Sequence, residues 1–264
     1  MTNIVYTLNS PKENKEANPL KISVVMQSFL GEYPGSRKNP EVKFKRAVNS
    51  FLNQTNKNTE LVIVSDGCQI TEKLWRENYQ DESRIKFIYV EKEGKNMYQE
   101  EEGIKFYRGR PRQAGVDIST GDIITYMDSD DFLMVEYLEV LRKYWESISE
   151  IDWLMNQGWW DNVEMFKNPV DGYYSIFENG KEEDLRTIQG LESQWIPSRM
   201  REKKIIMSPA LTSHRKSCTT KWQDSVGNSE DKDFNTRLRK DYIKGGLFWY
   251  PGYVRCHLRD KWDW

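Results

Sequence analysis

The segment Tyr126-Met-Asp-Ser-Asp-Asp131 places three carboxylates directly after an apolar run. Asp128 and Asp130 are separated by one turn residue, so both side chains can reach one ion. Carboxylate oxygens are the hard ligands that Mg²⁺ and Mn²⁺ prefer, and these ions are commonly shared with substrate phosphates. The spacing therefore indicates a Mn²⁺ or Mg²⁺ site. A polar turn in which Asp131 caps the next helix fits the same residues.

A second acidic pair, Glu230 and Asp231, opens the segment DKDFNTRLRKD. Its acidic start and basic end suit the dipole of a helix over residues 231–241. A carboxylate at such a position can act as a general base, and a neighbouring carboxylate raises its pKa when the two lie close. Taken alone, the stretch Asn228-Ser229-Glu230-Asp231 favours a simpler role as a helix-capping segment.

The composition excludes several classes of protein. The chain has 264 residues, which suits one α/β domain with or without a C-terminal extension. Lys and Arg number 39 against 41 Asp and Glu, for a net charge of −2, which disfavours a nucleic-acid partner. The three cysteines lack CxxC spacing, which disfavours a disulfide framework or a zinc site and favours a reducing compartment.

The distribution of polar and apolar residues indicates the cellular location of the protein. Residues 1–20 are polar, so we expect a flexible leader without a secretory signal. No run approaches the roughly 18 apolar residues of a membrane helix. We therefore expect a cytoplasmic protein, with peripheral membrane contact left open. The aromatic tail from Gly245 to Trp264 suits either a membrane-facing edge or the interface of a homo-oligomer.

The alternation of predicted strands and helices along the chain predicts an α/β fold. Continuous apolar runs predict strands covered on both faces, and the helical patterns between them imply a parallel sheet with crossover helices. His214 falls in a strand beside the core and is expected to be structural. The expected strands cover 21–26, 60–65, 84–90, 122–127 and 152–156, with shorter ones near 204–207 and 210–213, and the expected helices cover 41–55, 71–80, 110–119, 135–145 and 231–241.

The order of several short segments resembles family 2 glycosyltransferases of the GT-A fold. The resemblance covers residues 21–145 and continues more weakly to the end of the chain. Each segment is weak evidence alone, whereas their joint order is specific. The segments are Ile22-Ser-Val-Val25, Ala47–Thr55, Glu60–Cys68, Arg112-Gln-Ala-Gly115 and Gly121–Asp131, followed by Ser229–Leu238 and Val254–His257.

The resemblance implies a Rossmann-like, mostly parallel central sheet flanked by helices, with a C-terminal acceptor-side extension. Residues 21–145 then form the nucleotide-sugar-binding half, and residues 146–264 form the acceptor-binding and catalytic-base half of the same domain. Gln27, Ser28 and Phe29 are implied to line the nucleobase pocket, and Asp66 to accept a hydrogen bond from the nucleobase. Members often have Pro-Thr-Tyr-Asn where this chain has Gln-Ser-Phe-Leu, and an Asp at Ser65.

The resemblance also assigns the diphosphate and metal side of the donor site. Arg112 is implied to lie beside the nucleobase or the diphosphate, although Gln113 follows it where Asn is usual. Asp128, with Ser129, is implied to lie near the ribose or the sugar, and Asp130 to bind the metal with Asp128. His257 resembles a late histidine that reaches the metal or the diphosphate in some members. An ordinary structural histidine fits His257 equally well.

The implied activity is metal-dependent, inverting transfer of a hexose-like sugar from a nucleotide diphosphate, with uridine diphosphate expected. Asp231 is implied to be the general base, and the acceptor is a glycan or a lipid-linked sugar in polysaccharide synthesis. An acceptor platform is expected from sugar-stacking tryptophans, with Glu230 near it. Core packing remains the simpler role for any single tryptophan. The candidates are Trp159, Trp160 and Trp195.

Two other functions fit parts of the pattern. A sugar nucleotidyltransferase shares the strand order and a metal-binding Asp, but it carries a Gly-rich, basic loop after its first strand. Here the corresponding loop is Gln27-Ser-Phe-Leu-Gly31, without an early Lys. A degenerate module that binds sugar or nucleotide without turnover is the second alternative. The presence of Asp128, Asp130 and Asp231 argues against it.

Overall fold

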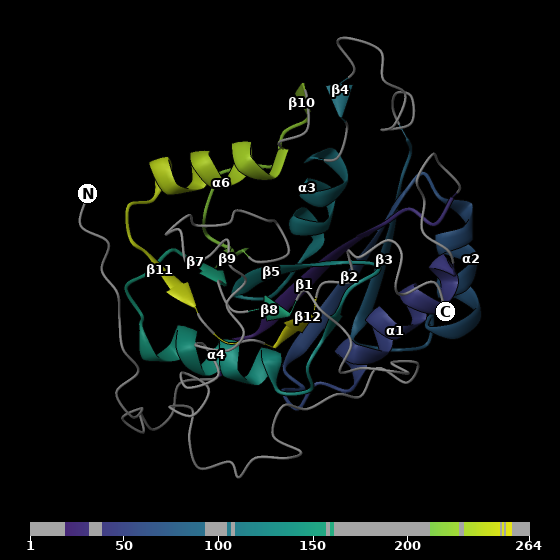
Figure 1. Cartoon of the computed structure of the whole chain (residues 1–264), viewed down its shortest axis with the longest axis horizontal. Coiled ribbons are helices and arrows are strands. Elements are labelled where there is room, and N and C mark those ends of the chain that lie inside the picture. Colours follow the sequence, from purple (N-terminus) through teal and green to yellow (C-terminus); the bar gives the residue numbers. More distant parts are fainter. Residues whose placement is uncertain are drawn as a thin grey trace.

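The computed structural model places helices on both faces of a central sheet (Figure 1). Helices α1 (Pro40–Leu52), α2 (Gln69–Asn78) and α4 (Tyr137–Ser147) cover one face, and α3 (Gly109–Ile118) and α6 (Glu230–Asp241) cover the other. This three-layer arrangement confirms the predicted α/β fold. The structure describes residues 19–31, 39–92, 105–106, 109–156, 159–160, 212–226, 230–248, 250 and 252–254.

The central sheet is mostly parallel, as the sequence predicts. Its strands are paired in parallel except that β9 runs antiparallel to both β5 and β7. Strands from both halves of the chain therefore share one sheet. In spatial order the strands are β11 (Gly245–Phe248), β7 (Trp153–Asn156), β9 (Thr212–Arg215), β5 (Ile123–Asp128), β1 (Ile22–Ser28), β2 (Thr59–Asp66) and β3 (Ile85–Val90).

Two smaller sheets lie beside the main one. One pairs β4 (Lys105–Phe106) with β10 (Ser225–Val226). In the other, β12 (Tyr253–Val254) lies between β6 (Phe132–Leu133) and β8 (Trp159–Trp160). The second sheet places the backbone of β8 one strand away from the segment that follows the acidic turn.

The strand register brings the candidate residues to one edge of the sheet. Gln27 of β1 lies opposite Asp128 of β5, while Asp66 is the last residue of the neighbouring strand β2. Because these strands are parallel, their carboxyl ends meet, and ligands of open α/β sheets bind at that edge. The fold therefore gathers the residues that the sequence suggested for the donor site.

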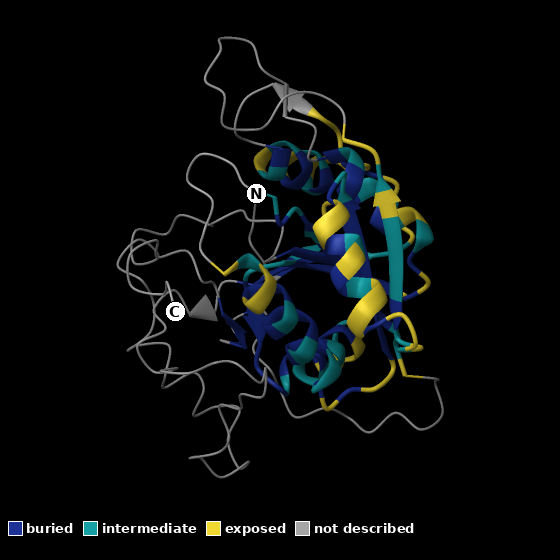
Figure 2. Ribbon diagram, turned by 90° about the vertical axis from the view of Figure 1, so that its right-hand side faces the viewer, coloured by how far each residue is buried: buried dark blue, intermediate teal, exposed yellow. Residues whose placement is uncertain are grey.

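Alternate residues of β1 pack into two separate layers of the hydrophobic core. Val24 and Met26 pack with α1 and α4, whereas Val25 packs with strand residues on the side of α3. Figure 2 shows the central strands buried and the outer faces of the helices exposed. Gly115 lets α3 approach the sheet closely, because a Cβ there would lie 2.6 Å from Val25. Burial on both faces explains the continuous apolar runs.

The predicted helices are all present, with shifted ends. Helix α1 ends at Leu52, before the predicted 55, and the Gln54 side chain after it bonds both to the helix and to the start of α4. The Gln54 amide donates to the Ser50 and Met134 carbonyls and accepts the Leu138 N–H. The strand predicted near 204–207 and all but the last two residues of the 1–20 leader lie outside the described residues. No helix among the described residues is long and apolar enough to cross a membrane.

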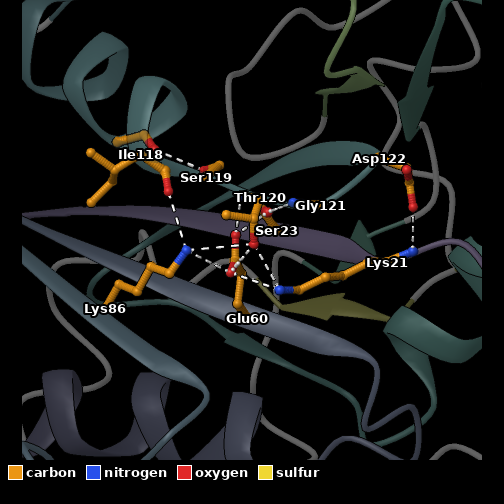
Figure 3. Close-up of polar contacts among 10 residues, drawn as sticks. Lys21, Ser23, Glu60, Lys86, Ile118, Ser119, Thr120, Gly121 and Asp122 are labelled. Carbon is orange, nitrogen blue, oxygen red and sulfur yellow. Dashed lines mark hydrogen bonds and ion pairs between the residues drawn. The ribbon is translucent and has the colours of Figure 1, made fainter.

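Glu60 ties together the strand ends opposite the candidate site (Figure 3). Its buried carboxylate accepts hydrogen bonds from Ser23 Oγ at 2.6 Å and Thr120 Oγ1 at 2.7 Å, and from the Thr120 N–H. Lys21 and Lys86 each place an ammonium 3.0 Å from it. Burial alone would raise the pKa of Glu60, but the hydrogen bonds from Ser23, Thr120 and Lys21 outweigh it and lower the pKa to about 2.

We expect Glu60→Gln to lower the free energy of unfolding by about 2–3 kcal/mol at pH 7, because a buried charged network loses its centre. The lowered pKa makes this stabilisation complete above the ordinary value of 4.5, and it is lost as pH falls toward about 2. Urea unfolding at pH 7 and pH 3 measures both effects. Glu77→Gln, which removes an exposed pair with Lys73, is the control and should change little. Equal losses of unfolding free energy in Glu60→Gln and Glu77→Gln would contradict the stabilising role of the Glu60 network.

Candidate functional site

Arg112 is the centre of the candidate site. Its guanidinium lies 3.1 Å from Glu230 Oε1, 3.8 Å from Asp231 Oδ1 and 3.7 Å from Asp128 Oδ1. Arg112 comes from α3, Asp128 from the end of β5, and the other two acids from the first turn of α6. The structure thus brings together the residues predicted for the donor side and for the general base.

Burial and charge fix the ionisation of Arg112. The residue is 8% exposed, and burial alone would lower its pKa. The carboxylates of Asp231, Asp128 and Glu230 outweigh that cost, so the pKa is raised. Arg112 therefore supplies a permanent positive charge between Asp128 and Asp231.

The pKa of the Asp231 carboxyl lies near neutral pH. Burial raises its pKa to about 7, with Glu230 and Asp128 adding to the rise and Arg112 opposing it. The side chain is 32% exposed, and its buried Oδ1 atom has no hydrogen-bond partner among the described residues. A partly accessible carboxylate with such a pKa has the properties that a general base requires.

Glu230 differs from its predicted place. We expected it near the acceptor, but it is 2% exposed and its Oε1 accepts a hydrogen bond from Arg112. Burial leaves its carboxylate little surface for an acceptor. The structure therefore assigns Glu230 to the support of Arg112.

The acidic turn after β5 is held from two sides. The Tyr253 hydroxyl donates to Asp131 Oδ2 at 2.7 Å and accepts the Asp128 N–H at 3.2 Å. On the other side, the buried Arg46 of α1 donates to the Asp130 carbonyl. Asp131 is buried at this bond, and α4 is capped at Glu136, so the alternative in which Asp131 caps the next helix is wrong.

The remaining carboxylates of the turn fit a divalent ion that also binds phosphate. Asp128 and Asp130, like Ser129 between them, are neither fully buried nor fully exposed. Among the described residues there is no cluster of three or more acidic, His or Cys side chains that would hold a metal without help. Two carboxylates with further positions left for water and diphosphate are typical of Mg²⁺ and Mn²⁺ sites. His257 lies outside the described residues.

Gln27 and Asp66 lie together at the ends of β1 and β2. Gln27 Nε2 donates to Asp66 Oδ2 at 3.0 Å, which fixes the carboxylate that is predicted to contact the nucleobase. Phe29 is half-buried, and the Lys92 ammonium lies 3.5 Å from its ring centroid. Ser28 is turned away, because its buried hydroxyl lies 3.1 Å from the Thr71 hydroxyl of α2.

Gly67 makes the close contact between this region and β3 possible. It follows Asp66 with a φ of 61°, a conformation that glycine adopts without strain. A Cβ at this position would lie 2.4 Å from Lys92 Cβ. The sequence shows the Asp-Gly turn but not that Lys92 comes to lie beside it.

The predicted acceptor platform remains a prediction, because the structure describes only the backbone of two of its three tryptophans. The backbone of Trp159 and Trp160 pairs with Tyr253 and Val254, which themselves pair with Leu133 and Phe132 after the acidic turn. The two residues therefore lie near the donor side of the molecule. The side chains of both tryptophans, and all of Trp195, lie outside the described residues.

His214 is structural, as expected. It is buried, and its Nε2 lies 2.7 Å from the hydroxyl of Tyr126. Burial lowers its pKa to about 4, so the ring is neutral at physiological pH. Its ring is buried against Tyr126 and Phe234, so it has almost no exposed surface for direct chemistry at the site.

The model of the glycosyl transferase family 2 matches residues 38–188, so the chain belongs to this family. An uncharacterized glycosyltransferase of Methanocaldococcus jannaschii is 31% identical over 137 residues, which cover 51% of this chain and 40% of that protein. The putative glycosyltransferase EpsH of Bacillus subtilis is 30% identical over 106 residues, which cover 40% of this chain and 27% of that protein. The chain thus spans less than half of these relatives.

Solved structures confirm the GT-A arrangement. The crystal structure of S. aureus TarS 1–349 in complex with UDP-GlcNAc matches with a TM-score of 0.60 and 17% sequence identity. The match covers 92% of this chain and 60% of that one. At this identity the likeness establishes the fold, which agrees with the α/β architecture expected from the sequence.

Proposed function

We propose that the chain transfers a sugar from a uridine diphosphate sugar to an acceptor hydroxyl, with inversion at the anomeric carbon. The observation that carries this proposal is the convergence of Asp128, Arg112 and Asp231 at the carboxyl edge of the sheet. One side of this cluster suits a diphosphate, and the other carries the Asp231 carboxylate, whose side chain is 32% exposed.

The leaving group requires positive charge, because the diphosphate becomes more negative as the sugar departs. Asp128 and Asp130 would hold Mn²⁺ or Mg²⁺, which when bound neutralises that developing charge. Arg112 adds a fixed positive charge that remains protonated at any physiological pH. The Tyr253 and Arg46 contacts keep the turn in place while the donor binds.

The acceptor requires a base. The Asp231 carboxylate takes the proton of the acceptor hydroxyl as its oxygen attacks the anomeric carbon. One carbon–oxygen bond forms while the bond to the diphosphate breaks, so a single displacement inverts that carbon. A pKa of about 7 allows a base to be deprotonated at neutral pH and still bind a proton well.

Uridine diphosphate is proposed for two reasons. Gln27 orients Asp66 as a hydrogen-bond acceptor, which matches the single N–H on the edge of uracil. TarS, whose fold this chain shares, has been solved with UDP-GlcNAc and with UDP. We further propose a glycan or lipid-linked acceptor, a role in polysaccharide synthesis and a cytoplasmic location. Membrane contact and self-association belong to the same proposal.

Release of UDP from UDP-GlcNAc by the purified chain, with and without Mn²⁺, tests this function. Slow transfer to water occurs at such sites even without the natural acceptor, so we expect Mn²⁺-dependent release that chelation with EDTA abolishes. Binding of UDP without any release from a panel of UDP-sugars would favour the degenerate binding module. Release that is independent of the metal would contradict the role of Asp128 and Asp130.

A further inference from the structure

Trp222 contacts all three elements that carry the candidate site. It lies in the segment between β9 and β10 and is buried. Its backbone N–H donates to Gln113 Oε1 of α3 at 2.8 Å, and its indole N–H donates to the Tyr126 hydroxyl of β5 at 2.8 Å. Its ring stacks on Phe234 of α6, with centroids 3.9 Å apart and planes 10° apart.

Each of these partners is close in sequence to a residue of the site. Gln113 follows Arg112 directly, and Tyr126 precedes Asp128 by two residues in the same strand. Phe234 lies three residues after Asp231, so both are neighbours on one face of α6. A displacement of Trp222 would therefore change the relative positions of all three elements.

Trp222 also contacts Arg112 itself. The guanidinium carbon lies 5.2 Å from the centroid of the indole ring, within the range of a cation–π contact. The indole thus supports one side of Arg112, while Asp128, Glu230 and Asp231 attract it from the other. Without the ring, the carboxylates would still attract Arg112, but its position among them would no longer be fixed.

We propose that Trp222 is a positioning residue, which acts through Arg112 to fix the separation of Asp128 and Asp231. Its effect on the placement of Arg112 follows from these contacts alone. Its effect on catalysis rests on the proposed function. Misplacement of reacting groups by about 1 Å can cost 100-fold in rate, so a residue without substrate contact can matter.

The chain offers a matched control in Trp145 of α4. This tryptophan is also buried, and its indole N–H donates to Ser213 Oγ at 3.1 Å. Arg215 lies over its ring at 5.3 Å. Trp145 therefore has the same kinds of contact as Trp222 but supports none of the acidic residues of the site. If Trp222 had only a structural role, its replacement would affect Arg112 and the rate no more than the replacement of Trp145.

The test compares Trp222→Leu with Trp145→Leu by ¹⁵N NMR of arginine guanidinium groups, with the Arg112 signals assigned from Arg112→Lys. In the wild type, we expect separate Nη–H signals for Arg112, because its contacts restrict rotation. Trp222→Leu should merge or broaden these signals, and Trp145→Leu should leave them unchanged. Unchanged Arg112 signals in Trp222→Leu would overturn the proposal, whether or not the chain releases UDP.

The second measurement is Mn²⁺-dependent UDP release from UDP-GlcNAc. In Trp222→Leu we expect kcat to fall about 10-fold to 100-fold with little change in KM, and in Trp145→Leu we expect no such fall. A proportional loss in both variants would overturn the catalytic part of the proposal. If Trp222→Leu does not fold, Trp222→Met, which also removes the aromatic ring but has a longer and more adaptable side chain, decides in its place by the same criteria. Absence of release in the wild type would contradict the proposed function and leave the NMR result decisive for Arg112.

Discussion

Replacing Asp231 by Asn lowers the rate of sugar transfer by about 10²-fold to 10⁴-fold, the range expected for loss of a general base. Asn keeps the shape of the side chain and its place 3.8 Å from Arg112, but it cannot accept a proton. In the wild type, the rate should rise with pH up to about 7, where the Asp231 carboxyl loses its proton. In Asp231→Asn this dependence on pH should disappear from the residual rate.

The same substitution should stabilise the protein, because activity and stability depend on Asp231 in opposite ways. A carboxyl whose folded pKa is raised from 3.8 to about 7 destabilises the folded state progressively as pH rises through that range. Removal of the charge in Asp231→Asn should therefore raise the free energy of unfolding at pH 8 by about 1–3 kcal/mol. Thermal melts at pH 5 and pH 8 measure the difference, which should be larger at pH 8.

Asp233→Asn is the control for both effects. Asp233 lies in the same first turn of α6 and pairs with Arg237 at 2.6 Å on the outer side of the helix. It shares any effect of the helix dipole but does not contact Arg112. Equal losses of rate in the two variants would contradict the assignment of Asp231 as the base.

Replacing Asp130 by Ala lowers the Mn²⁺-dependent rate by about 100-fold or more, because charge stabilisation by a metal is worth several kcal/mol. The fold should survive, because the bond from Arg46 to the backbone carbonyl of residue 130, which helps to hold the turn, is kept in the variant. Titration of activity with Mn²⁺ should show a much higher half-saturating concentration. Asp81→Ala, at an exposed position in the turn after α2, is the control and should behave as the wild type. An unchanged metal dependence in Asp130→Ala would remove this residue from the metal site.

The sequence was sufficient to predict the strands of the first half of the chain. Buried parallel strands leave continuous apolar runs, and β1, β2 and β5 follow the predicted runs closely. The positions of Asp66 and Asp128 at strand ends follow from the same runs. Ser28 could not be placed, because a side chain at a strand end can point to either face, and here it points toward α2.

The residues that hold the site in place could not be predicted from the sequence, because they are distant in the chain from the residues that they contact. The bond between Tyr253 and Asp131 spans 122 positions, and the bond between Arg112 and Glu230 spans 118. Trp222 and Lys92 lie in segments without periodic patterns, so nothing marks them locally. Two features of the sequence hinted at aromatic support for the site: the ten tryptophans and the aromatic C-terminal segment. Ordinary packing in the hydrophobic core explains both features equally well.

Binding of nucleotide diphosphates tests the central claim most directly. Thermal shifts would be recorded for UDP, CDP, GDP and ADP, with and without Mn²⁺, on the wild type and on Asp130→Ala. We expect a shift for UDP of about 5 °C at a hundredfold excess over Kd, dependent on Mn²⁺ and lost in the variant. A folded wild-type protein that shows no shift with any nucleotide would contradict the assignment of a donor site to Asp66, Asp128 and Asp130.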